Sequence, residues 1–194
     1  LGTAENKYPS LTGYIGNPAI NITIMLLIIV GGIGFLTWDD IYTNKWHFKK
    51  YRMQSKVILV TTAILIIAPA VFFFFCDFTG LPLDKRILAS LFQSVTPRTA
   101  GFNTADLPAM TGSSKAIMTM LMLVGGSPGS TAGGMKTTTL AVLILSAFSV
   151  CRKKDDAEVC GRRIDGSAVK NAAAVAVMYF LLFFVGGIVI STAE

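Results

Sequence analysis

The fold of this chain is decided by one stretch, Gln93-Ser94-Val95-Thr96-Pro97-Arg98-Thr99-Ala100-Gly101-Phe102-Asn103. It follows an apolar run, Ile87 to Phe92, that is too short to cross a bilayer. Long apolar segments lie on both sides of it. Non-helical backbone is tolerated at membrane depth only where protein or water surrounds it. We therefore predict that Thr99 to Asn103 is a turn at which the chain dips into the membrane and returns.

The composition is that of a membrane protein. Of 194 residues, 53% are hydrophobic and 14% are charged, whereas soluble domains carry about 25% charged residues. The net charge of +6 comes from basic residues clustered between apolar segments, which is typical of a topology signal rather than of a nucleic-acid partner. We expect contact with membrane lipid and no nucleic acid. Because the chain begins with Leu1 and ends beside an apolar run, we expect an internal fragment.

The sequence offers no recognisable enzyme chemistry. Its three cysteines have no metal-binding spacing, and its single histidine, His47, lies in a basic loop without partner ligands. No Ser/His/Asp arrangement for nucleophilic catalysis stands out. We therefore predict that the chain is not an enzyme and has no catalytic residues.

Long apolar segments predict an all-α integral membrane protein. Ala19 to Trp38, Val57 to Cys76 and Ala172 to Ile190 are each long enough to cross a hydrocarbon core of about 30 Å at about 1.5 Å per residue. A shorter helix is expected over Ile87 to Val95. Asp84, just before it, is a candidate N-cap because its carboxylate can accept from free amides of the first turn.

Two loops rich in lysine and arginine, 45–56 and 151–171, separate these segments. Positive charge collects on the cytoplasmic side of membrane proteins, so both loops are predicted to be cytoplasmic. Residues 77–115, which contain the predicted turn, are then expected on the outer side.

The segment 116–150 is predicted to be a crossing broken at its centre. As one helix it would be about 50 Å long, well beyond a core of about 30 Å. Glycines and a proline also interrupt it. Residues 57–150 therefore have the order helix, short pore helix with a turn, and broken helix, which is the order of a potassium-channel-like repeat.

The turn has residues that suit a cation filter. A cation that crosses the bilayer exchanges its hydration water for other oxygens, and rings of backbone carbonyls supply them. Gly101 accepts backbone angles that are closed to other residues, and Thr99 would add its hydroxyl. The residues alone leave a second interpretation open, which is an extracellular loop with a tight glycine turn.

The glycine-rich centre of 116–150 admits three interpretations. Gly129 and Gly134 have the spacing of a phosphate-binding loop, but Met135 stands where that loop needs lysine and the flanks are membrane helix segments. Close helix packing through small residues is the second interpretation. The third is a mobile loop across a conduction path, with Lys136 as a charge near mid-membrane.

Three motifs, in order, resemble the Trk/Ktr/HKT superfamily of potassium transporters. Phe92 to Asn103 resembles a filter segment of that family. Gly125 to Lys136 resembles its intramembrane gating loop. Gly31-Gly32-Ile33-Gly34-Phe35 with Trp38-Asp39-Asp40 resembles the end of its second repeat. The basic loop and short linkers are most similar to the Ktr-type bacterial membrane subunit.

The resemblance implies a division of the chain into repeats. In that family four helix–pore-loop–helix repeats surround one pore. Residues 1–56 would be the end of the second repeat, and 57–150 the complete third repeat. Residues 151–194 would be a cytoplasmic loop and the first helix of the fourth repeat.

The resemblance also implies which residues act. The selectivity filter would bind K⁺ at Thr99, Ala100, Gly101 and Phe102, with Asn103 as the last residue of the segment. The residues implied in the gate loop are Gly125, Gly126, Ser127, Gly129, Ser130, Thr131, Gly133, Gly134 and Lys136.

Potassium uptake is the function that the resemblance implies, with Na⁺ as a candidate second ion. It also implies a homodimer of the full-length pore subunit, a cytoplasmic ring of nucleotide-binding regulatory subunits, and a multi-pass location in the bacterial inner membrane. The residues alone also allow a secondary transporter that binds a small organic solute at the broken helix.

Overall fold

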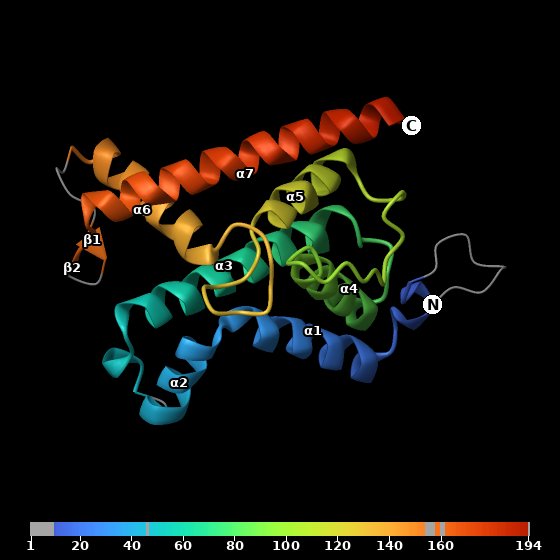
Figure 1. Ribbon diagram of the computed structural model, residues 1–194. Helices are drawn as coiled ribbons and strands as arrows, with labels where there is room; N and C mark the ends of the chain where they lie inside the picture. The colour runs from blue at the N-terminus through green and yellow to red at the C-terminus, as the bar shows by residue number, and fades with distance from the viewer. Residues whose placement is uncertain (1–9, 46, 154–157, 160–161, 194) are drawn as a thin grey trace.

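The computed structural model describes residues 10–45, 47–153, 158–159 and 162–193. This part of the chain is helical apart from one short antiparallel hairpin (Figure 1). The elements are η1 (Thr12–Tyr14), α1 (Pro18–Ile33), α2 (Phe35–Asn44), η2 (Phe48–Lys50), α3 (Met53–Cys76), α4 (Leu83–Val95), α5 (Gly112–Leu123), α6 (Thr137–Cys151), β1 (Glu158–Val159), β2 (Arg162–Arg163) and α7 (Gly166–Ala193).

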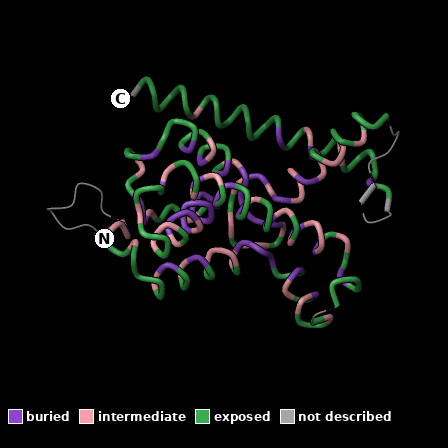
Figure 2. Tube along the Cα trace, turned by 180° about the vertical axis from the view of Figure 1, so that it is seen from behind, coloured by how far each residue is buried: buried purple, intermediate pink, exposed green. Residues whose placement is uncertain are grey.

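The short helix α4 is at the centre of the core. On one side, Phe92 and Val95 of α4 pack with Met25 of α1 and Ile66 of α3. On the other side, Ala89 of α4 belongs to an apolar cluster that joins the end of α3 to α5. Figure 2 shows buried residues gathered in the middle of the molecule, whereas α7 is exposed over most of its length. The core therefore surrounds the helix that leads into the predicted filter.

Helices long and apolar enough to cross a membrane are present where the sequence predicts them. Among the described residues α3 and α7 qualify singly, and α1 with α2 qualifies as a bent pair. Both single helices begin before the apolar segments, α3 at Met53 and α7 at Gly166. At the start of α7 the Ser167 hydroxyl donates to Asp165 Oδ2 over 2.5 Å. This hydrogen bond lowers the pKa of Asp165 below its ordinary value.

The prediction of one helix over Ala19 to Trp38 is wrong, because the chain breaks at Gly34. The two helices meet there at 97°. Gly34 has φ of 90°, which favours glycine, and a Cβ at this position would lie 2.6 Å from the Pro128 carbonyl oxygen. The break at Gly34 therefore depends on a contact with residues far along the chain.

The prediction of Asp84 as the N-cap of α4 is also wrong. Pro82 occupies the N-cap position and no side chain caps the helix there. Asp84 lies in the first turn instead, where its negative charge still suits the positive end of the helix dipole. The helix contains the predicted run Ile87 to Val95.

The predicted interruption within 116–150 is present: two helices, α5 and α6, are separated by residues 124–136. We call residues 124–136 the glycine-rich loop. In Figure 1 this loop lies between α6 and the break at Gly34 that separates α1 from α2, which we call the α1–α2 break. Asp77, after α3, holds the start of α5 by accepting from the Thr111 amide over 2.9 Å and from the Ser114 hydroxyl.

The start of α3 and the hairpin strands β1 and β2, which belong to the two basic segments, lie at one end of the molecule, and α4 lies toward the other (Figure 1). The start of α3 and the residues before α7, including Arg163 and Ile164, line a common pocket of about 350 Å³. This shared end is the arrangement that the prediction of two cytoplasmic loops requires, although the side of the membrane itself stays a prediction.

Candidate functional site

Thr96 closes the chain back onto the end of α4. It is 2% exposed. Its carbonyl accepts from the amides of Ala100 over 3.2 Å and Gly101 over 3.3 Å, and its hydroxyl donates to the carbonyl of Phe102. One buried residue thus bonds to three inner residues of the predicted turn. We call Thr99 to Asn103 the filter turn.

Two residues of the filter turn have left-handed backbone. Gly101 has φ of 75° and Thr99 has φ of 65°. A positive φ is ordinary for glycine, but a β-branched residue adopts it only under constraint, at a cost of about 1–3 kcal/mol. A Cβ at Gly101 would meet no atom within 4 Å. Backbone angle, rather than lack of space within this chain, therefore favours glycine at Gly101.

The filter turn is exposed at its tip and tied at its end. Thr99, Gly101 and Phe102 are exposed in this chain, Phe102 by 44%. The Asn103 amide donates to Ser10 Oγ over 2.8 Å, and its carbonyl accepts from the Leu11 amide over 2.8 Å.

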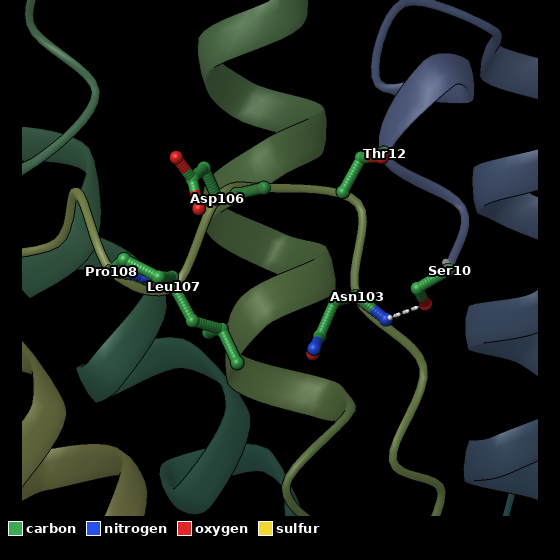
Figure 3. Close-up of a pocket in the computed structure, with 7 residues that line it drawn as sticks. Ser10, Thr12, Asn103, Asp106, Leu107 and Pro108 are labelled. Atoms are coloured by element: carbon green, nitrogen blue, oxygen red, sulfur yellow. Dashed lines mark hydrogen bonds between the residues drawn. The ribbon is translucent and has the colours of Figure 1, made fainter. Parts of the chain in front are cut away.

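Figure 3 shows the Asn103–Ser10 bond at the rim of a pocket of about 330 Å³. The pocket is lined by Ser10, Thr12, Asn103, Ala105, Asp106, Leu107 and Pro108. The segment before α1 therefore holds Asn103, the last residue of the turn, although the two segments are far apart in the sequence.

The two ends of the glycine-rich loop are joined by backbone hydrogen bonds at a neck formed by Val124 and Met135. Val124 and Met135 form a parallel bridge, and the Gly125 amide donates to the Met135 carbonyl over 2.9 Å. A Cβ at Gly125 would lie 1.6 Å from the carbonyl oxygen of Gly133. Only glycine fits at Gly125, because the two arms of the loop touch through their backbones.

The tip of the glycine-rich loop, Ser127 to Thr131, contacts the α1–α2 break. The Ser127 amide donates to the Gly32 carbonyl over 2.9 Å, and the Thr131 amide donates to the Gly31 carbonyl over 3.2 Å. These amides are occupied by protein carbonyls, so they are not free to bind phosphate. Close packing of small residues describes the observed contacts better than a phosphate-binding loop does.

A family model named TrkH, described as "Cation transport protein", matches residues 6–194. This chain belongs to the TrkH family. The resemblance inferred from the three motifs is thereby confirmed, and the predominantly helical fold with its long apolar helices agrees with it.

Relatives of this TrkH-family chain carry names from potassium transport. The "Potassium/sodium uptake protein NtpJ" of Enterococcus hirae is 38% identical over 92% of this chain and 40% of the relative. The "Ktr system potassium uptake protein B" of Bacillus subtilis is 32% identical over 95% of this chain and 43% of the relative. The chain thus spans about two fifths of these proteins.

A solved structure shares the fold of this TrkH-family chain. The potassium transporter TrkH from Vibrio parahaemolyticus superposes with a TM-score of 0.73 and 22% sequence identity. The match covers 92% of this chain and 40% of that one. At this level of identity the comparison supports the fold.

Lys136 has an unusual place in this TrkH-family chain. It occupies the N-cap position of α6, where a positive charge opposes the helix dipole. Its Nζ donates to the Ala132 carbonyl over 2.8 Å. Helix stability does not explain this charge, so Lys136 stays a functional candidate.

The structure keeps the two predicted groups of site residues on separate segments. The filter turn is tied to Ser10 and Leu11, before α1, whereas the tip of the glycine-rich loop is tied to the end of α1. Sequence reasoning missed Thr96 and Gly34, which position the two segments. The run Gly31-Gly32-Ile33-Gly34 was singled out through the resemblance, which did not indicate its contact with the glycine-rich loop.

Proposed function

We propose that the full-length protein takes up potassium ions across the bacterial inner membrane through a pore that this chain lines in part. The observation that carries the proposal is the filter turn after the buried last turn of α4, with left-handed backbone at Thr99 and Gly101. The names of the relatives support potassium as the ion. The name of the Enterococcus hirae protein supports Na⁺ as a second ion.

In this proposal the carbonyls of Thr99, Ala100, Gly101 and Phe102 replace part of the hydration shell of K⁺. Asn103 anchors the end of the filter turn through its hydrogen bonds to Ser10 and Leu11. One turn cannot surround an ion, so turns from other repeats complete the ring. The exposed tip of the filter turn is where such partners would meet it.

The glycine-rich loop restricts ion flow below the filter in this proposal. Lys136 is the charge that a cation would meet beside the loop. The neck formed by Val124 and Met135 keeps the loop compact, so that a short segment can move without unfolding α5 or α6.

The proposed assembly with other subunits is taken from the family resemblance. We propose a multi-pass subunit that forms a homodimer and carries a cytoplasmic ring of nucleotide-binding regulatory subunits at its basic end. The protein transports rather than catalyses in this proposal. No observation specifically favours a transporter of a small organic solute.

The filter is tested by Gly101→Ser in the full-length protein. A side chain at φ of 75° is strained, so the carbonyls around position 101 must shift. We expect the ratio of K⁺ to Na⁺ uptake to fall about tenfold, a loss of about 1.4 kcal/mol in discrimination. Gly112→Ser is the control, since Gly112 has open space and no positive φ. Unchanged selectivity in the Gly101 variant would rule out this filter assignment.

The gate is tested by deleting residues 127–133 from the full-length protein. This deletion removes the tip of the glycine-rich loop and the two residues after it. It should raise K⁺ uptake several-fold, because the proposed restriction is gone, and should leave the ratio of K⁺ to Na⁺ uptake intact. The measurement is K⁺ uptake by the deletion variant and by the parent protein, in cells that lack other potassium transporters. Unchanged or lower flux in a well-folded variant contradicts the gate.

A further inference from the structure

The α1–α2 break leaves two helix ends that need hydrogen-bond partners. The last carbonyls of a helix and its first amides have no partner within that helix. At the end of α1, the Val30 carbonyl accepts from Trp38 Nε1 over 3.1 Å. The carbonyls of Gly31 and Gly32 and the first amide of α2, that of Phe35, depend on other segments.

The tip of the glycine-rich loop satisfies both of these ends. It donates to α1 through the amides of Ser127 and Thr131, which bond to Gly32 and Gly31. The Thr131 hydroxyl adds a second bond to the Gly31 carbonyl over 3.2 Å. The loop also accepts from α2, because the Phe35 amide donates to the Gly129 carbonyl over 3.1 Å. The loop thus caps the end of α1 and the beginning of α2 together.

The fit between loop and break leaves no room for larger groups. A Cβ at Gly34 would press on the Pro128 carbonyl oxygen at 2.6 Å, and one at Gly126 would lie 3.0 Å from the Gly32 carbonyl oxygen. In contrast, a Cβ at Gly133 would meet nothing within 4 Å. A Cβ is therefore excluded at Gly34, where the break meets the loop, and is accommodated at Gly133.

We propose that docking on the α1–α2 break holds the glycine-rich loop in its observed position, with Thr131 and Gly34 as positioning residues. The 97° bend and the loop then change conformation together. When the loop leaves, α1 loses donors and α2 loses an acceptor, so the bend loses the bonds that fix it. This inference rests on the proposed role of the loop as a restriction in the ion path.

Hydrogen–deuterium exchange in the full-length protein tests the coupling without any assumption about flux. Thr131→Val removes one hydroxyl bond and Thr131→Ser retains it, while Gly34→Ala displaces the loop and Gly133→Ala does not. We expect Thr131→Val and Gly34→Ala to speed exchange both at 127–131 and at 30–38, because the two segments open as one unit. The two controls should match the parent. Faster exchange in only one of the two segments overturns the proposal.

Potassium uptake provides the second readout. Loss of one hydrogen bond shifts a conformational equilibrium about fivefold, so Thr131→Val should raise uptake by up to about that factor, with the ratio of K⁺ to Na⁺ uptake unchanged. If deletion of 127–133 raises uptake and Thr131→Val does not, the gate stands and the docking proposal falls. If the deletion leaves uptake unchanged, the gate fails and exchange alone decides the coupling. If Gly34→Ala does not fold, Thr131→Val carries both readouts.

Discussion

Thr96 holds the filter turn through two different oxygen atoms. Its carbonyl accepts from two amides of the turn and its hydroxyl donates to the carbonyl of Phe102. Thr104 provides a contrast a few residues later. It is equally buried, but its hydroxyl has no hydrogen-bond partner among the described residues. Two threonines in one stretch therefore have different roles.

We predict that Thr96→Val weakens discrimination between K⁺ and Na⁺ in the full-length protein. The change preserves shape but frees the Phe102 carbonyl, removing a bond worth about 1 kcal/mol. Selectivity should fall several-fold in an uptake assay with both ions. Thr104→Val is the matched control and should change neither selectivity nor expression. Equal behaviour of the two variants would show that the Thr96 hydroxyl does not fix the turn.

At the scale of elements, the corner between α2 and α3 is held by a buried carboxylate. Asp40 is 3% exposed. Its Oδ2 accepts from the Arg52 amide over 3.1 Å and from the Ser55 hydroxyl over 2.5 Å, and its Oδ1 lies 3.4 Å from Arg52 Nε. Its charge also lies at the positive end of the α3 dipole. The neighbouring Asp39 contacts the same arginine at the surface, with both side chains 58% exposed.

We predict that Asp40→Ala destabilises the protein by about 3 kcal/mol, because it leaves the buried amide and hydroxyl without their acceptor. Asp39→Ala should cost at most about 1 kcal/mol, as an exposed ion pair does. Thermal unfolding of the two purified variants in the same detergent makes the comparison. Similar losses for both would mean that the buried bonds contribute no more than the surface pair.

At the scale of the whole molecule, this chain has surfaces that only further protein or lipid can cover. Arg98 is buried beside the filter turn, yet its Nε and Nη2 have no hydrogen-bond partner among the described residues. A buried guanidinium without acceptors is costly. The filter turn presents its tip outward, and α7 is exposed along its apolar length. The tip of the filter turn and the apolar length of α7 are therefore available for contact with further protein or lipid.

We predict that the 194-residue chain expressed alone inserts into the membrane but supports no potassium uptake. One filter turn offers carbonyls on a single side of an ion, and the acceptor for Arg98 is then missing. Growth of potassium-uptake-deficient bacteria at low K⁺ measures this, with the full-length parent as the positive control. Growth supported by the chain alone would contradict a shared filter.

The sequence by itself determined the membrane class, the long apolar helices α3 and α7, the short helix α4 and the interruption between α5 and α6. These depend on local hydrophobic length and on glycine and proline, which act over a few residues. The filter turn and the glycine-rich loop could also be placed in the sequence, because their residue types restrict or widen backbone angles locally.

Only the tertiary structure decided where α1 breaks, how the turn is held and where the loop lies. The bend at Gly34 is selected by Pro128 and Gly129, and the end of the turn is held by Ser10 and Leu11. Likewise, the positive φ of Thr99 comes from a constrained turn and not from its residue type. Hydrogen bonds between distant segments carry no periodic signal in the sequence, so they appear only when the chain is folded.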